Sequence, residues 1–309
     1  MTMQQADWAG VFPAITTPFR ADGAVDHPAL AEHVTWLADA GCAGIVTGGS
    51  LGEAATLSFD EKVRINETCV RALAGRVPVV AGIAGLATAE CVALAQAAEQ
   101  AGCEGLMALP AYVYNSGDWR ETRAHYGAII AATSLSCMLY NNPIAYGTDV
   151  RAAQLAELAD AHENLHAVKE SSGDVRRVSA VRAELGDRLA VFAGLDDMIL
   201  EAIGVGAVGW IAGLVNALPE ESVALVALAR AGRWEEATAI YHWFLPLLRM
   251  DTVPKFVQLI KLVQAEVGRG NEGVRAPRLV LAGAERDEAL ALIRERLACR
   301  PELPALARR

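Results

Sequence analysis

The sequence predicts an α/β fold of the (β/α)8 TIM-barrel type, followed by a C-terminal helical extension. Short apolar runs alternate with longer amphipathic runs eight times within residues 10–231, which is the count and spacing of such a barrel. The apolar runs are nearly continuous, as in parallel strands that are covered on both faces. An open doubly wound sheet would often carry a glycine fingerprint after its first strand, whereas this strand ends in Thr16, Thr17, Pro18 and Phe19.

The predicted elements alternate along the chain. Strands are expected at residues 10–17, 43–47, 77–83, 105–109, 136–141, 165–170, 189–193 and 208–212. Helices are expected at residues 27–40, 60–74, 88–101, 119–132, 152–161, 175–185, 197–205 and 220–231. Three of these helices are followed by a glycine that can end them, Gly41, Gly75 and Gly102. Residues 1–231 form the predicted barrel, and 232–309 form an extension in which 234–298 is expected to make about three helices packed on the barrel.

Composition limits the classes of partner. The chain has 309 residues, a net charge of −10 and 53% hydrophobic residues. An acidic surface disfavours binding to nucleic acid or to anionic membranes, although a locally positive pocket can still bind a small anionic substrate. The uncharged stretch 202–218 contains four glycines and precedes Pro219, so we interpret it as a helix end, a strand and a loop rather than a membrane helix. The six cysteines form no C-x-x-C pair, which is typical of buried thiols in the reducing cytoplasm.

The candidate chemistry lies at the carboxyl ends of the strands, where the active sites of such barrels form. Lys169 ends the sixth strand, and alternation along the strand turns it away from the side that Val168 faces. A lysine there either pairs with a carboxylate at the rim or points into the barrel, where burial lowers its pKa and leaves a neutral amine that can attack a carbonyl carbon. Tyr140 ends the adjacent strand and is either a core aromatic residue or a proton carrier for that amine.

A glycine-containing turn follows the second strand. Gly49, Ser50 and Leu51 can offer successive backbone N–H groups to a substrate carboxylate, with the Ser50 hydroxyl as a further donor. The simpler interpretation is a loop that needs glycine only for its backbone geometry. The turn is expected on the same barrel face as Lys169 and Tyr140, which favours a shared site.

Four motifs at these strand ends resemble those of a known family. In chain order they are GSLGE at 49–53, LYNNP at 139–143, VKESS at 168–172 and GLDD at 194–197. Together they make nearly the whole chain similar to the dihydrodipicolinate synthase / N-acetylneuraminate lyase superfamily of class I aldolases. The resemblance implies that Lys169 forms the Schiff base and that Tyr140 and Ser50 move protons.

The resemblance also implies binding residues and an assembly. The implied substrate-binding positions are Gly49, Ser50, Leu51, Gly194 and Ile211. Tyr112, with Tyr114 as its rival in the same loop, would be the tyrosine that the family lends across a subunit interface to the proton relay. The implied protein is a homotetramer of paired dimers that needs neither a metal nor an organic cofactor.

Two departures from the family pattern narrow the expected reaction. Ala145 stands where dihydrodipicolinate synthases carry an arginine for the substrate's far carboxylate, and Leu51 replaces a second hydroxyl of the turn. Three stretches, 139–147, 169–177 and 251–261, are instead similar to the subgroup that acts on 1-pyrroline-4-hydroxy-2-carboxylate. The chain is therefore expected to be a Schiff-base lyase or deaminase of hydroxyproline degradation, with 2,5-dioxopentanoate and ammonia as products.

Four alternative functions remain open at this point. The nearest is a retro-aldol lyase that uses the same lysine on a 4-hydroxy-2-oxo acid or a keto-deoxy sugar acid. The second is a condensing enzyme like dihydrodipicolinate synthase. The third is a metal-dependent barrel aldolase, against which stands the absence of any histidine at a predicted strand end. The fourth is a non-catalytic barrel used for sensing or assembly.

Overall fold

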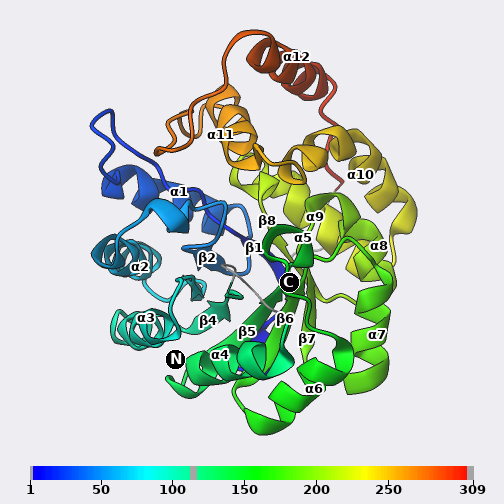
Figure 1. Cartoon of the computed structure of the whole chain (residues 1–309). Coiled ribbons are helices and arrows are strands. Elements are labelled where there is room, and N and C mark those ends of the chain that lie inside the picture. The colour runs from blue at the N-terminus through cyan, green and yellow to red at the C-terminus, as the bar shows by residue number, and fades with distance from the viewer. Residues whose placement is uncertain (1–2, 112–116, 305–309) are drawn as a thin grey trace.

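The computed structural model describes residues 3–111 and 117–304, which form a barrel of parallel strands surrounded by helices (Figure 1). The strands in these ranges are β1 (Gly10–Pro13), β2 (Ile45–Thr47), β3 (Val79–Ile83), β4 (Gly105–Ala108), β5 (Ser136–Asn141), β6 (Leu165–Glu170), β7 (Ala190–Ala193) and β8 (Gly209–Ala212). Their spatial order is β1-β8-β7-β6-β5-β4-β3-β2, and a parallel bridge between Ala14 and Val46 joins β1 to β2. The (β/α)8 fold expected from the sequence is therefore confirmed.

Helices follow the strands on the outside of the barrel (Figure 1). In the described residues they are α1 (His27–Asp39), α2 (Phe59–Leu73), α3 (Thr88–Gln100), α4 (Trp119–Ala131), α6 (Ala152–Ala161), α7 (Arg176–Leu185), α8 (Ile199–Gly204) and α9 (Pro219–Arg230). A short additional helix, α5 (Pro143–Tyr146), lies directly after β5. The extension contains α10 (Trp234–Leu248), α11 (Phe256–Glu266) and α12 (Gly283–Ala298). No helix in the described part of the chain has the length and apolar character needed to cross a membrane.

The first strand is shorter than predicted: it ends at Pro13 instead of at residue 17. From Thr16 onward, side chains and loops replace strand neighbours as hydrogen-bond partners. The backbone N–H of Thr16 donates to Asn216 Oδ1 at 3.2 Å, and the hydroxyl of Thr17 donates to the carbonyl of Gly52 at 2.7 Å. The prediction was wrong here because an apolar run shows where a strand can lie but not where its ladder ends.

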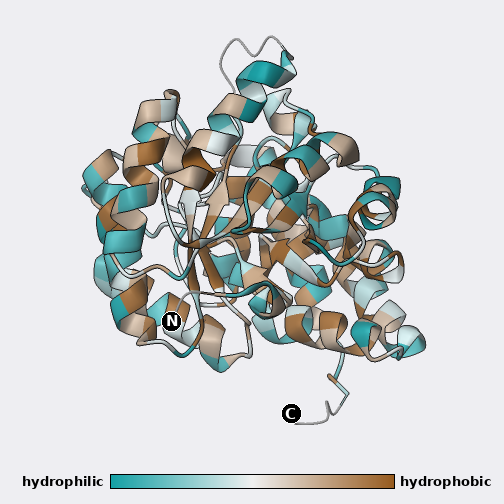
Figure 2. Cartoon of the chain, turned by 90° about the horizontal axis from the view of Figure 1, so that it is seen from below, coloured by the Kyte–Doolittle hydropathy of each residue, from teal (hydrophilic) through white to brown (hydrophobic). Residues whose placement is uncertain are grey.

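Two hydrophobic layers form on the two sides of the strands. In Figure 2 the central strands are mostly hydrophobic, whereas the surrounding helices alternate between hydrophobic and polar residues. Inside the barrel, the rings of Phe12 and Phe192 meet edge to face with centroids 5.5 Å apart, and Trp8 stacks on Phe12. Val168 belongs to the outer layer, between strands and helices. Lys169, the next residue, lies on the inner side, as strand alternation requires.

The helical extension is tied to the turn after β2 by a buried ion pair. Lys261 on α11 is 2% exposed and donates to Glu53 Oε1 at 2.7 Å, while the Glu53 side chain is fully buried. The same ammonium donates to the carbonyls of Thr17 and Gly273 at 2.8 and 2.6 Å, and the backbone N–H of Arg275 donates to Glu53 Oε2 at 3.0 Å. The extension therefore fixes the glycine-containing turn through the buried side chain of Glu53.

The six cysteines are all unpaired in the structure. Five of them are buried, as expected for small hydrophobic residues. Cys299 is exposed, so the expectation of burial was wrong for this residue. Its position directly after α12 explains the difference, because the chain there has left the packed part of the extension.

Candidate active site

A cavity of about 580 Å³ opens at the carboxyl ends of the strands. Its lining brings together seven residues that the sequence analysis proposed for the site, namely Gly49, Ser50, Leu51, Tyr140, Lys169, Gly194 and Ile211. Tyr112 and Tyr114, the two candidates for a tyrosine shared between subunits, lie outside the described residues. The volume suits a small organic acid of the size expected from the sequence.

Lys169 is buried beside Tyr140 at the centre of this cavity. The two residues are direct neighbours in the parallel register of β5 and β6, and Lys169 Nζ lies 4.2 Å from the centroid of the Tyr140 ring. Burial lowers the pKa of Lys169 to about 8, although the charges of Asp251 and Asp196 oppose this shift. Among the described residues no carboxylate lies within 4.0 Å of this amine. It is therefore not a rim lysine held in an ion pair, and its neutral fraction at neutral pH is larger than that of an exposed lysine.

The phenol of Tyr140 is also buried and oriented. Its hydroxyl accepts a hydrogen bond from Asn142 Nδ2 at 2.9 Å. Burial raises the pKa of Tyr140 to about 12, so the phenol is protonated and can donate its proton to a reacting group. The buried hydroxyl of Ser171 lies close enough to the phenol to lower its pKa. It nevertheless forms no hydrogen bond of good geometry with any described residue.

Tyr146 is a candidate functional residue that the sequence analysis missed. It ends α5, a helix whose first turn is fixed by Pro143 and by the Asn142 side chain, which accepts from the N–H of Ala145 at 2.9 Å. The Tyr146 and Ser50 hydroxyls are hydrogen-bonded, and the rings of Tyr146 and Tyr140 pack edge to face with centroids 5.9 Å apart. Tyr146 thus connects the glycine-containing turn to Tyr140, because its hydroxyl bonds to Ser50 and its ring packs on the Tyr140 ring. The signal in the sequence was the proline after an asparagine, which starts a helix.

Three acidic residues, Asp196, Asp197 and Asp251, lie in or next to the cavity that contains Lys169. Asp196 and Asp197 belong to a 3-10 turn after β7, η3 (Asp196–Met198). Asp251 comes from the extension, at the end of the 3-10 turn η5 (Arg249–Asp251). Burial raises the pKa of Asp196 and of Asp251, most strongly for Asp251. Within residues 3–111 and 117–304, no group of three His, Cys, Asp or Glu residues is arranged to hold a metal ion.

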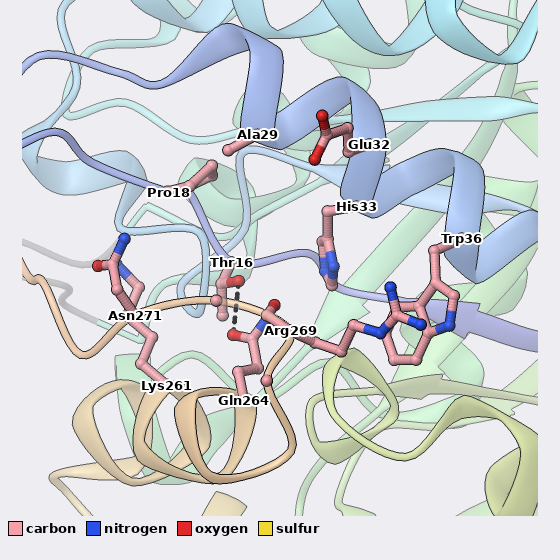
Figure 3. A pocket seen from close by; sticks show the side chains of 12 residues that line it. Thr16, Pro18, Ala29, Glu32, His33, Trp36, Lys261, Gln264, Arg269 and Asn271 are labelled. Atoms are coloured by element: carbon pink, nitrogen blue, oxygen red, sulfur yellow. Dashed lines mark hydrogen bonds between the residues drawn. The ribbon is translucent and has the colours of Figure 1, made fainter.

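A second, smaller cavity of about 200 Å³ lies away from this site, between α1 and the segment after α11 (Figure 3). The Thr16 hydroxyl donates to Gln264 Oε1 there at 2.8 Å, and the Arg269 guanidinium lies 4.6 Å from the centroid of the Trp36 ring. Burial lowers the pKa of His33 to about 4. None of the described residues predicted for the active site lines this cavity.

Comparison with known proteins places these features in a family. The model of the dihydrodipicolinate synthetase family matches residues 7–296. The 4-hydroxy-tetrahydrodipicolinate synthase of Haloarcula marismortui is 35% identical over 297 residues, which cover 96% of this chain and 95% of that protein. The synthase of the same name from Rhizobium meliloti is 34% identical over 87% of this chain and 92% of that protein.

Solved structures agree with the sequence relatives. The 4-hydroxy-tetrahydrodipicolinate synthase of Methylacidiphilum fumariolicum SolV superimposes with a TM-score of 0.88 at 29% identity, over 94% of this chain and 97% of that one. A dihydrodipicolinate synthase of Acinetobacter baumannii, solved in complex with pyruvate, gives a TM-score of 0.88 at 29% identity over 93% of this chain and 98% of that one. The similarity extends over the barrel and most of the extension.

Proposed function

This chain belongs to the dihydrodipicolinate synthetase family, and on that premise we propose that it is a class I enzyme that forms a Schiff base between Lys169 and a small 2-oxo acid or cyclic imino acid. The observation that carries the proposal is the buried amine of Lys169, which forms no ion pair with a described residue and lies 4.2 Å from the Tyr140 ring centroid inside the cavity. Pyruvate, the ligand of the Acinetobacter baumannii relative, is a 2-oxo acid. In the same proposal the enzyme is a cytoplasmic homotetramer that uses no cofactor.

The reaction we favour converts 1-pyrroline-4-hydroxy-2-carboxylate to 2,5-dioxopentanoate and ammonia. The neutral amine of Lys169 adds to C2 of the cyclic imine, and the ring opens to leave a protein-bound imine and a free amine at C5. Loss of a C3 proton and of the C4 hydroxyl as water follows, with Tyr140 as a proton carrier. The C5 amine tautomerises to an imine. Hydrolysis of that imine and of the lysine adduct releases ammonia and the product, so that one water is consumed overall.

The cavity lining supports this substrate over one with two carboxylates. Ala145 lines the cavity at the position where the resemblance expects an arginine, and Lys169 is the one cation among the described lining residues. A second carboxylate on the substrate would find no guanidinium there and would lie near Asp197 and Asp251. The second candidate function is 4-hydroxy-tetrahydrodipicolinate synthesis, which the names of the relatives favour.

Two measurements test the proposal. Borohydride reduction in the presence of the hydroxypyrroline carboxylate should add the mass of the reduced adduct to the peptide that contains Lys169, and the Lys169→Ala variant should show no adduct. Ammonia release and consumption of substrate should then both be measured for four substrate sets: the hydroxypyrroline carboxylate, 4-hydroxy-2-oxoglutarate, N-acetylneuraminate, and pyruvate with aspartate semialdehyde. Absence of the adduct in an active enzyme contradicts the Schiff base, and turnover of the last set alone identifies the synthase.

A further inference from the structure

The extension places a carboxylate inside the barrel mouth. Asp251 lies in the cavity lining together with Lys169 and Tyr140, although it belongs to η5 beyond the last barrel helix. A Cβ built on Gly213, the residue after β8, would lie 2.0 Å from Asp251 Oδ1. The carboxylate therefore occupies the space directly over the Gly213 Cα, and only a glycine at that position leaves room for it.

The hydrogen bonding of Asp251 differs from that of its neighbours. The buried carboxylate of Asp196 accepts from Trp210 Nε1 at 3.0 Å, from the N–H of Gly213 at 3.1 Å and from the N–H of Leu214 at 2.8 Å. Its oxygens are thus used in holding the turn after β8. No described residue donates a hydrogen bond to Asp251, and no described cation lies within 4.0 Å of it. A partly buried carboxyl group without a hydrogen-bond partner is costly for folding, so its place in the cavity points to a ligand that supplies the partner.

We propose that Asp251 is a catalytic residue that contacts the distal end of the substrate and donates the proton with which the C4 hydroxyl leaves as water. This inference rests on the proposed function. After the C3 proton is lost, the Lys169 imine has become an enamine. Its C2–C3 electrons then form the C3–C4 double bond, the C4–O bond breaks with its electron pair on oxygen, and the oxygen takes the carboxyl proton of Asp251. One molecule of water leaves and the lysine imine is restored.

The charges around Asp251 suit this role. Burial and the nearby carboxylates of Asp196 and Asp197 on η3 raise its pKa well above the ordinary value, while the ammonium of Lys169 on β6 opposes that shift. The shift makes the carboxyl group of Asp251 easier to protonate than that of an exposed aspartate, and the protonated form can donate a proton. Tyr140 is left to serve the steps at C2 and C3, which its contact with Lys169 fits.

The test separates adduct formation from the loss of water. In Asp251→Asn, borohydride should still label Lys169 in the presence of the hydroxypyrroline carboxylate, whereas ammonia release should fall about 100-fold or more. The alkaline decline of the pH–rate profile, where the acid loses its proton, should disappear from the residual activity. Retention of the adduct also shows that the variant is folded around its substrate.

The comparator is Asp197→Asn, which changes the charge next to Asp251 but leaves the Asp251 carboxyl group in place, so its turnover should fall less than that of Asp251→Asn. If this variant loses as much turnover as Asp251→Asn, a general change of charge explains both and the specific role of Asp251 is overturned. Activity of Asp251→Asn within about threefold of the wild type, on the scale of general acid catalysis, overturns it as well. If the wild type itself gives no adduct at Lys169, the proposed function fails first, and the two failures are therefore distinguishable.

Discussion

The substitution Gly194→Ala tests whether the position of the Lys169 side chain limits activity. A Cβ on Gly194 would lie 2.8 Å from Lys169 Cε, 2.9 Å from its Cγ and 1.9 Å from Ser171 Oγ. Carbon atoms in contact prefer a separation of about 3.5–4.0 Å, so the lysine side chain must move by roughly 1 Å. A displacement of that size can cost about 100-fold in rate, and the added methyl group should cost about 1–3 kcal/mol of stability.

The assay compares kcat/KM, borohydride labelling of Lys169 and the free energy of unfolding in urea. Gly204→Ala is a matched control, because among the described residues its new Cβ would meet only Trp234 Cη2, at an ordinary 3.8 Å. We expect Gly204→Ala to keep both activity and stability. If Gly194→Ala retained kcat/KM within about threefold of the wild type, against the expected hundredfold loss, close packing around the amine would not be a condition of its reactivity.

Three further predictions follow from the same structure. Because burial lowers the pKa of Lys169 to about 8, kcat/KM should rise with pH toward that value as the ammonium becomes a neutral amine; a profile that falls between pH 6 and 8 would contradict this. Tyr140→Phe should lower kcat by about 10²–10⁴-fold in steady-state assays while the protein remains folded, and unchanged kcat would exclude the phenol from proton transfer. Lys261→Met should destabilise the protein by about 3–5 kcal/mol, because the buried Glu53 carboxylate loses its nearest cation and keeps only the more distant Arg278 guanidinium at 3.7 Å; urea unfolding should show partial recovery when Glu53→Gln is added, and no recovery would refute the ion-pair argument.

The barrel and the neighbouring positions of Lys169 and Tyr140 could be predicted from the sequence because both depend on local patterns. Apolar runs locate strands, and alternation along β6 decides that Lys169 and Val168 face opposite sides. In a barrel of consecutive parallel strands, the ends of β5 and β6 must be neighbours, so Tyr140 and Lys169 had to meet. The glycine-containing turn at Gly49 joins them because every β-to-α loop opens on the same face.

Only the tertiary structure reveals the contacts that Tyr146 and Asp251 make near the site. Tyr146 lies on a helix of four residues, too short for any periodic pattern to reveal, and its contact with Ser50 depends on the angle at which that helix leaves β5. Asp251 belongs to an extension whose packing is not implied by the barrel, and its contact with Gly213 arises from long-range packing of η5 against the end of β8. Sequence patterns determine which way a side chain faces within its own element, whereas the approach of distant segments is set by how whole surfaces fit together.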